Sequence, residues 1–165
     1  MSYYIIIRGP LGSGKSTISE KLAQKLDAKH FEMDEILEKH GLDKIPPGEP
    51  CISVENFIKA NEIVLPEVKK LLAAGQIVIF DACFYHKEVV EHLIQSLRMP
   101  HYIFTLEAPL RVCIKRDSER DNPHGEDSAH AVYSLVSRFD RGNIINAAGS
   151  IDETLADIVS HLPSE

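Results

Sequence analysis

The sequence contains Gly9-Pro10-Leu11-Gly12-Ser13-Gly14-Lys15-Ser16 directly after a short apolar run at 3–7. This stretch fits the pattern G-x-x-x-x-G-K-S/T of the phosphate-binding loop, or P-loop. The glycines let the backbone curl so that successive N–H groups point inward and can hold a polyphosphate. A strand pattern precedes the loop and a helix pattern follows it, as the motif requires. This context argues against the alternative, a glycine-rich turn with an incidental lysine.

The residue types of the loop have distinct expected roles toward a nucleotide. We expect Lys15 to reach the β- and γ-phosphates and the Ser16 hydroxyl to lie next to Mg²⁺. The helix that begins near Lys15 directs the positive end of its dipole at the phosphates. The predicted nucleotide-binding residues are Gly9, Leu11, Gly12, Ser13, Gly14, Lys15, Ser16, Thr17 and, from further along the chain, Arg116.

Strand and helix patterns alternate along the rest of the chain. Apolar runs predict strands at 3–7, 30–33, 76–80, 101–106 and 143–146. Helical spacing predicts helices at 16–27, 35–40, 53–74, 87–97, 110–120 and 150–161, and one more after a polar loop at 121–128. Pro66 is expected to kink the helix at 53–74 or to divide it. Strands separated by such helices predict an α/β fold, a parallel sheet with helices on both faces.

Composition limits the class of protein. The 165 residues include 44% hydrophobic and 26% charged residues, and 18 basic against 25 acidic residues give a net charge of −7. One domain over 1–165 is expected at this length. The negative balance disfavours duplex nucleic acid and membrane surfaces as partners, although a local basic cleft is compatible with it.

Sequence features that bear on location all favour the cytoplasm. The three cysteines are scattered and form no CxxC pair, which is typical of a reducing compartment. No apolar run approaches the roughly 18 residues of a membrane span. The N-terminus lacks the basic region of a signal peptide.

Two aspartates lie at the ends of predicted strands. Asp81 follows the strand at 76–80, where ligands bind in open α/β sheets, and it could hold Mg²⁺ directly or through water. The alternative is a cap of the next segment. Asp34 would lie on the same sheet edge, where a carboxylate could accept the proton of an attacking hydroxyl. Asp is also a favoured helix N-cap, and these two roles of Asp34 are compatible.

Arg116 and Arg120 are four residues apart and share a helix face. The polar loop at 121–128 follows, so the pair fits a lid that brings positive charge to a transferring phosphoryl group. The alternative is a solvated helix end whose arginines pair with nearby carboxylates. Arg138 and Arg141 are weaker candidates for the same role. His86 is expected to face solvent, and the alternative is that it lines the acceptor pocket. Cys83, a small residue, is expected to be buried or half-buried near the site.

Four stretches carry a resemblance to a known group: GPLGSGKST at 9–17, MDEI at 33–36, IVIFDACF at 77–84 and PLRVCIKRDSER at 109–120. With them the chain resembles small P-loop kinases of the nucleoside-monophosphate-kinase-like group over essentially its whole length. DACFYH at 81–86 resembles the polynucleotide-kinase-like branch more than the shikimate- and gluconate-kinase-like branch, because the glycine cluster of shikimate kinases is missing. The resemblance implies a three-layer α/β fold with a lid and a parallel five-stranded sheet in the order 2-3-1-4-5.

The resemblance also implies an activity, the transfer of the γ-phosphoryl group of ATP, with Mg²⁺, to a hydroxyl or phosphate of a small-molecule or nucleotide acceptor. The implied catalytic residues are Lys15, Asp34, Arg116 and Arg120, and the implied metal ligands are Ser16 and Asp81. In this group the first lid arginine commonly stacks on adenine and the second contacts phosphates. Segment 41–66 is expected to cover the acceptor and segment 117–130 to form the lid.

Two other readings bear on the function. A GTPase would need NKxD and DxxG motifs, and neither occurs in the sequence. A non-catalytic or weakly hydrolytic ATP-binding regulatory module would keep Lys15 and lack a usable acceptor pocket. The chain is expected to be a monomer or homodimer.

Overall fold

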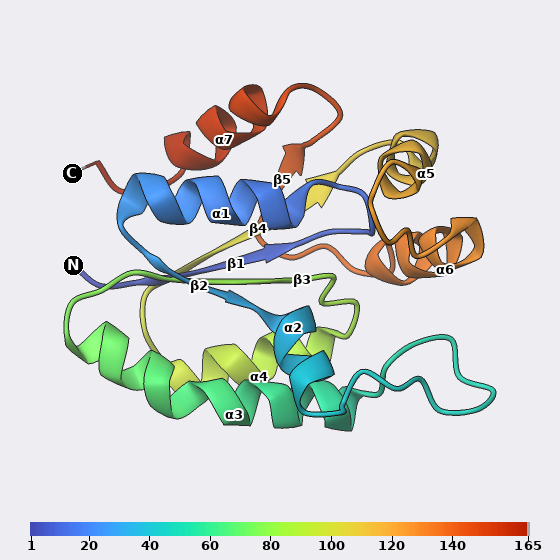
Figure 1. Ribbon diagram of the computed structural model, residues 1–165. Helices are drawn as coiled ribbons and strands as arrows, with labels where there is room; N and C mark the ends of the chain where they lie inside the picture. Colours follow the sequence, from blue (N-terminus) through green and yellow to red (C-terminus); the bar gives the residue numbers. More distant parts are fainter. Residues whose placement is uncertain (165) are drawn as a thin grey trace.

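Five parallel strands form one sheet in a computed structural model that describes residues 1–164; residue 165, the last of the predicted domain, lies outside the described residues. The strand order β2-β3-β1-β4-β5 confirms the predicted order 2-3-1-4-5 (Figure 1). In chain order the strands are β1 (Tyr4–Arg8), β2 (Lys29–Glu32), β3 (Val78–Ala82), β4 (His101–Glu107) and β5 (Asn143–Asn146).

The apolar run near the start of the chain forms the central strand β1, which is buried on both faces. All five of its residues are buried, and Ile5 pairs with Ile79 of β3 on one side and with Tyr102 of β4 on the other. Alternate side chains then enter two separate hydrophobic cores, with Tyr4 and Ile6 in one and Ile5 and Ile7 in the other. A strand buried on both faces has no polar face to present to solvent.

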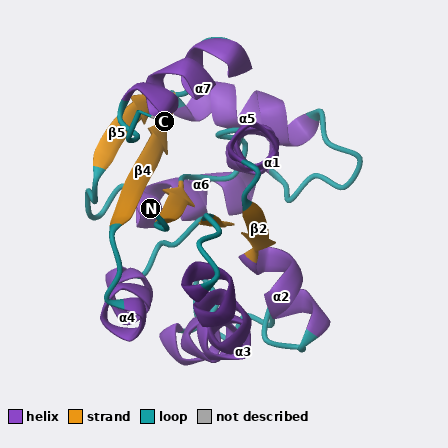
Figure 2. Ribbon diagram, turned by 90° about the vertical axis from the view of Figure 1, so that its left-hand side faces the viewer, coloured by secondary structure: helices purple, strands orange, loops and turns teal. Residues whose placement is uncertain are grey.

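Helices cover both faces of the sheet, as predicted. The helices α1 (Lys15–Leu26) and α7 (Ile151–Ser160) lie on one face, and α3 (Val54–Ala73) and α4 (Lys87–Leu97) lie on the other (Figures 1 and 2). The shorter helices α2 (Met33–Lys39), α5 (Leu110–Ser118) and α6 (Glu126–Val136) lie near the carboxyl ends of the strands. These three helices therefore surround the end of the sheet where ligands bind in open α/β folds.

The structure corrects several predicted boundaries. Helix α3 continues through Pro66, so the predicted division of this helix is wrong. Leu65 and Val68, on either side of Pro66 in the sequence, are buried in the hydrophobic core, so burial of this face stabilises the helix although the proline removes a backbone hydrogen bond. Strand β3 extends past 80, because Asp81 pairs with Ile7 of β1. Asp81 therefore lies within the strand.

Two further boundaries differ at the lid and at α2. Helix α6 begins at Glu126, inside the predicted polar loop at 121–128. Helix α2 begins at Met33 with Glu32 as its N-cap, so Asp34 lies in the first turn and is not the cap. In the part of the chain that the structure describes, no helix is long and apolar enough to cross a membrane.

Candidate active site

The P-loop joins β1 to α1 and adopts the curled backbone that its glycines predict. Gly12 and Gly14 have φ values of 78° and 90°, and the Ser13 N–H donates to the Pro10 carbonyl at 3.2 Å. A Cβ on Gly12 would lie 2.1 Å from the carbonyl oxygen of Cys113, the residue of α5 that packs over the loop. Glycine is therefore required at this position both by the backbone angle and by the space available.

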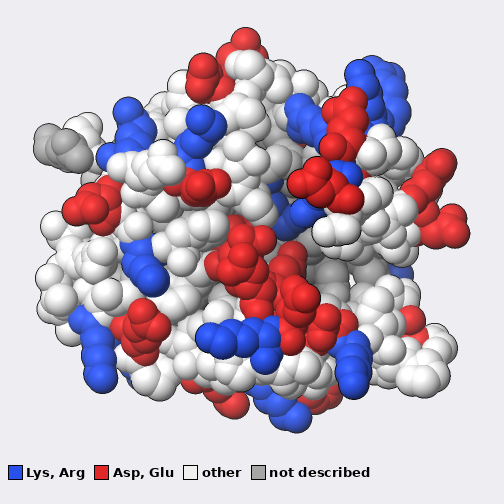
Figure 3. Space-filling view, in the orientation of Figure 1, with Lys and Arg blue, Asp and Glu red and all other residues white. Residues whose placement is uncertain are grey.

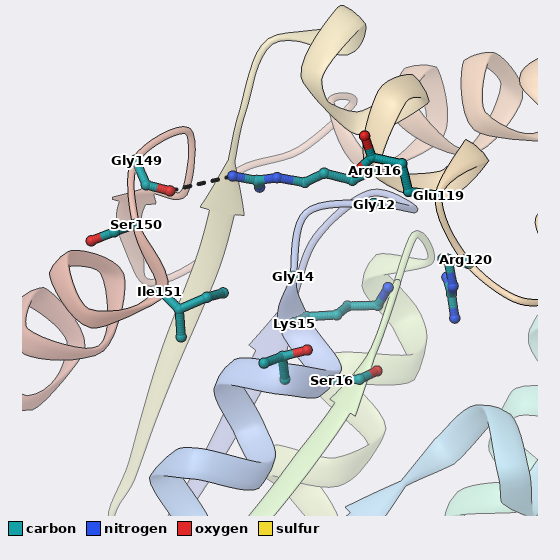
Figure 4. A pocket seen from close by; sticks show the side chains of 11 residues that line it. Gly12, Gly14, Lys15, Ser16, Arg116, Glu119, Arg120, Gly149, Ser150 and Ile151 are labelled. Carbon is teal, nitrogen blue, oxygen red and sulfur yellow. Dashed lines mark hydrogen bonds between the residues drawn. The ribbon is translucent and has the colours of Figure 1, made fainter.

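A cavity of about 470 Å³ lies over the P-loop and is bounded by α5 and the start of α7 (Figure 4). Of the predicted nucleotide-binding residues, Gly12, Gly14, Lys15, Ser16, Thr17 and Arg116 line it. Leu11 instead lines a second cavity, and the Ser13 side chain is buried with no hydrogen-bond partner for its Oγ among the described residues. Gly9 lies where a Cβ would contact the Ser13 Oγ at 2.7 Å. The first cavity is the candidate nucleotide site.

The Lys15 side chain is buried and lies among acidic groups. Burial alone would lower the pKa of this amine, but the Cys83 thiol and the carboxylates of Asp34 and Asp81 outweigh burial and raise it. Lys15 therefore stays protonated and can act as a fixed positive charge toward phosphates. As predicted, Cys83 is buried next to this group.

Both arginines of the predicted lid line the nucleotide cavity, and the Arg116 guanidinium is directed toward Gly149 (Figure 4). Arg116 donates to the carbonyls of Ala147 at 2.8 Å, Gly149 at 3.3 Å and Ser13 at 3.4 Å, and so ties α5 to the P-loop and to the loop before α7. Arg120 stands on the side of the Lys15 ammonium group. The alternative, in which both arginines pair with nearby carboxylates, is wrong for Arg116, which bonds to backbone carbonyls, and agrees with the structure for Arg120, whose Nη1 lies 3.9 Å from Asp117 Oδ1.

The candidate magnesium position is formed by Ser16 and Asp81. The Ser16 hydroxyl donates to Asp81 Oδ1 at 3.5 Å, and Asp81 is almost fully buried. Among the described residues no group of three or more His, Cys, Asp or Glu side chains could hold a metal ion. Mg²⁺ usually takes one or two protein oxygens and completes its shell with phosphates and water, so one hydroxyl and one carboxylate fit this ion.

His30 is a neighbour of Asp81 that the sequence did not reveal. Its Nε2 contacts Asp81 Oδ2 across the pair β2–β3. Burial lowers the pKa of His30, but the hydrogen bond and the charge of Asp81 outweigh burial and raise it. This contact orients the carboxylate that faces Ser16. The only sequence signal, a histidine on the predicted second strand, becomes informative once the strand pairing is known.

Asp34 lines the second cavity and interacts electrostatically with Lys15, which lines the nucleotide cavity. Asp34 is exposed to solvent, because it faces an open cavity. The surrounding protein nevertheless excludes much of the water around its carboxyl group. This desolvation raises the pKa of Asp34, the Lys15 charge lowers it, and the net direction is upward. A carboxylate with a raised pKa is a better proton acceptor than an ordinary surface aspartate.

The second cavity, of about 480 Å³, is the candidate acceptor site. The segment at 41–66 contributes Asp43, Ile45, Pro50, Cys51 and Ile52 to its wall, and α2 and α6 supply the other sides. Two side chains hold this segment in place. The Tyr85 hydroxyl accepts the Ile52 N–H at 3.1 Å, and His86 Nε2 lies 2.7 Å from the Ile52 carbonyl oxygen. His86 is thus half-buried against the cavity cover, and the prediction that it faces solvent is wrong.

The segment after α5 folds around a buried aspartate. Asp117 accepts hydrogen bonds from the backbone N–H groups of His124 at 3.2 Å and Gly125 at 3.0 Å, and its Oδ1 lies 3.9 Å from Arg120 Nη1. Burial would raise the pKa of Asp117, but these hydrogen bonds outweigh burial and lower it. Arg120 from this segment lines the nucleotide cavity and His124 lines the second cavity. Segment 117–130 therefore borders both.

Arg8 is a second group that sequence reasoning missed. It is fully buried at the end of β1, and it donates to Val136 O at 2.9 Å, Phe139 O at 3.1 Å and Phe84 O at 3.3 Å. Its guanidinium also lies 4.0 Å from the centre of the Phe139 ring. Arg8 thereby anchors the C-terminal end of α6 to the sheet.

The weaker arginine candidates line neither cavity. Arg138 is exposed beyond the end of α6. Arg141 pairs with Glu91 of α4 at 2.9 Å. The structure therefore does not bring these two arginines to the candidate site.

Comparisons with known proteins agree with this architecture. A family model described as "AAA domain" matches residues 5–141. No curated protein matches the chain. A sugar kinase from Janibacter sp. has a TM-score of 0.78 at 15% identity, over 97% of this chain and 94% of that one.

Two other solved structures share the fold. The APS kinase of Mycobacterium tuberculosis, in complex with AMPPNP and APS, has a TM-score of 0.70 at 16% identity, over 96% of each chain. A gluconokinase from Sinorhizobium meliloti has a TM-score of 0.68 at 15% identity, over 95% of this chain and 89% of that one. At such low identity these similarities show the fold alone.

Proposed function

Because this chain belongs to the family described as AAA domain and has the fold of several kinases, we propose that it transfers the γ-phosphoryl group of ATP to a small acceptor. The sequence left a hydroxyl and a phosphate open as the accepting group. Asp34 supports a hydroxyl, because a carboxylate with a raised pKa at the acceptor cavity can take up the hydroxyl proton.

One observation carries this proposal: a charged group of the cavity over the P-loop interacts with a charged group of the second cavity. Lys15 lines the cavity over the P-loop, Asp34 lines the second cavity, and the two groups influence each other electrostatically. A donor phosphate held on one side would then face an acceptor held on the other. Phosphoryl transfer needs little covalent chemistry from the protein beyond this positioning and the neutralisation of charge.

Each group of the chain has a role in the proposed reaction. The P-loop amides and Lys15 bind the phosphates, and Arg120 adds positive charge on the side of the Lys15 ammonium group. Arg116 holds the P-loop and the loop before α7 together beside the nucleotide. Ser16 and Asp81 would hold Mg²⁺, which neutralises phosphate charge when it is bound. Asp34 orients the acceptor hydroxyl and accepts its proton.

Acceptor-dependent formation of ADP tests the proposal. The protein is mixed with ATP and Mg²⁺ and a panel of nucleosides, nucleotides, sugars, amino alcohols and hydroxy acids. We expect at least one acceptor to raise ADP formation above the background without acceptor. Lys15→Ala should abolish this activity, whereas Lys21→Ala, an exposed lysine of the same helix, should keep it.

The regulatory-module alternative predicts a different result. It gains support if ATP binds and no acceptor in the panel raises ADP formation. The cavity at Asp34 argues for the enzyme, because a module that only binds nucleotide has no need of a second cavity beside the nucleotide site.

A further inference from the structure

The second cavity has an acidic lining. Four carboxylates face it, from Asp34 and Glu38 of α2, Asp43 of the segment that covers it and Asp127 of α6. No lysine or arginine occurs among the described residues that line this cavity. In Figure 3 acidic side chains gather around α2, beside the hollow between α2 and α6.

Lys15, Arg120 and Arg138 do not line the second cavity. Lys15 and Arg120 line the nucleotide cavity, where a bound polyphosphate would face them. Arg138 acts on the Cys51 thiol only through its electrostatic field and does not line the second cavity. A carboxylate or phosphate on the acceptor would thus meet four carboxylates and, as the one side chain that can carry a positive charge among the described lining residues, His124, whose Nδ1 lies 3.1 Å from Asp117 Oδ1. Protein sites that select such anions supply arginine or lysine.

The remaining wall of the cavity is mainly apolar, with His124 and Ser128 as polar members. Its apolar side chains include Leu11, Leu37, Ile45, Ile52 and Val132, which come from the P-loop, α2, the covering segment and α6. A cavity of about 480 Å³ is large enough for a small organic molecule. Its walls suit a ligand with an apolar body and a polar group at each end.

We propose that the acceptor is a small hydroxyl compound with an apolar body and a protonated amine, and that the cavity excludes hydroxy acids and phosphorylated acceptors. The hydroxyl lies at Asp34 and the amine lies toward Glu38, Asp43 and Asp127. The proposal rests on the phosphotransferase function given above. In the reaction a bond forms between the acceptor oxygen and Pγ, the bond from Pγ to the bridging oxygen breaks, ADP keeps that electron pair, and Asp34 takes the hydroxyl proton.

A matched series of three ligands tests this inference by direct binding. Phenylethanolamine, phenylethylene glycol and mandelate share a phenyl ring and a benzylic hydroxyl, and they differ in an ammonium, a hydroxyl and a carboxylate group. Their dissociation constants are measured by ligand-observed NMR on the protein loaded with Mg²⁺ and a non-hydrolysable ATP analogue. We expect the amine to bind about tenfold more tightly than mandelate, with the glycol between them, since partly exposed carboxylates attract the ammonium group and repel the carboxylate group.

Substitutions of acidic lining residues test whether the cavity causes this preference for the amine. In the double variant Asp43→Asn/Asp127→Asn the preference for the amine over mandelate should fall to about threefold or less, and in the wild-type protein it should shrink as salt rises. Asp157→Asn, an exposed aspartate of α7, is the matched control and should keep the full preference. The inference is overturned if mandelate binds as tightly as the amine, if the double variant keeps the preference, or if the amine does not bind while the nucleotide does.

Phosphoryl transfer separates this inference from the proposed function. Selective binding of the amine without transfer to any acceptor would contradict the phosphotransferase and leave the ligand class standing. Efficient phosphorylation of hydroxy acids would support the phosphotransferase and contradict the ligand class.

Discussion

Gly12 shows how much a single residue of the P-loop constrains. Its positive φ and its contact with the Cys113 carbonyl each exclude a side chain. The sequence motif predicts the first constraint. The second depends on the packing of α5 over the loop, about which the motif carries no information.

Gly12→Ala should weaken ATP binding at least about tenfold, because the left-handed backbone costs roughly 1–2 kcal/mol and the added Cβ displaces the loop from α5. Gly48→Ala is the matched control, since Gly48 has a φ of 81° with no atom within 4 Å of the added Cβ. Calorimetric titration with ATP and Mg²⁺ measures both variants. Equal affinity in the two variants would contradict the close approach of α5 to the loop.

Asp34 gives a prediction for the pH dependence of the reaction. The base must be ionised to accept a proton, and burial raises its pKa above the ordinary range near 3.9. The rate should therefore fall as the pH drops through this raised pKa, and the fall should begin at a higher pH than for an ordinary aspartate. The profile of kcat/KM against pH measures it.

Asp34→Asn supplies the control for this profile. The variant should keep ATP affinity and lose the acid limb together with most of the rate. An unchanged acid limb in its residual activity would assign the titration to another group, and an unchanged rate would remove Asp34 from the mechanism.

At the scale of elements, Arg8 and Asp117 hold the structure around the two cavities. Arg8 joins β1 to α6 through contacts 128 and 131 residues apart in sequence, and Asp117 folds the chain between α5 and α6 onto itself. Burial lowers the pKa of Arg8 to about 10, so it stays charged at neutral pH. Both residues act on the position of α6, which forms one wall of the second cavity.

Arg8→Met should reduce the free energy of unfolding by about 3 kcal/mol or more, because several buried carbonyl groups lose their charged donor. Urea denaturation measures the loss. Arg111→Met, at an exposed position of α5, should change stability by less than about 0.5 kcal/mol. Similar values for the two variants would show that the Arg8 contacts contribute little.

Asp117→Ala should loosen the segment between α5 and α6, because the amides of His124 and Gly125 lose their acceptor. Hydrogen exchange at these two amides should accelerate at least about tenfold, in line with the loss of roughly 1.5 kcal/mol of local protection. Asp121→Ala, an exposed position in the same segment, is the control. Unchanged exchange in Asp117→Ala would mean that the segment is held by other contacts.

Over the whole molecule, the sequence predicts what is local and leaves open what depends on distant contacts. The P-loop comes from consecutive residues, so its conformation could be read directly, and the alternation of strands and helices predicted the layers. Contacts between distant parts could not be predicted in this way. His30 meets Asp81 across 51 residues, and the Arg8 contacts depend on the placement of α6. His86 was misassigned because the chain that covers it lies far away in sequence.

Each of the two cavities also brings together charged groups that lie far apart in the sequence. A net charge of −7 disfavours binding of polyanions, and yet Lys15, Arg116 and Arg120 from separate elements line one cavity over the P-loop. Acidic groups from α2, the covering segment and α6 line the other. The two cavities thus differ in the sign of their charge, which fits the proposed roles of the first as the site of the phosphate donor and of the second as the site of the acceptor.

The fate of the γ-phosphoryl group tests the central claim most directly. Phosphorus NMR of a reaction with ATP, Mg²⁺ and phenylethanolamine distinguishes a phosphate ester of the acceptor from inorganic phosphate. We expect ADP and the phosphate ester to appear in equal amounts, and Asp34→Asn to slow the formation of both. Inorganic phosphate as the sole product, with the same yield in Asp34→Asn, would contradict it.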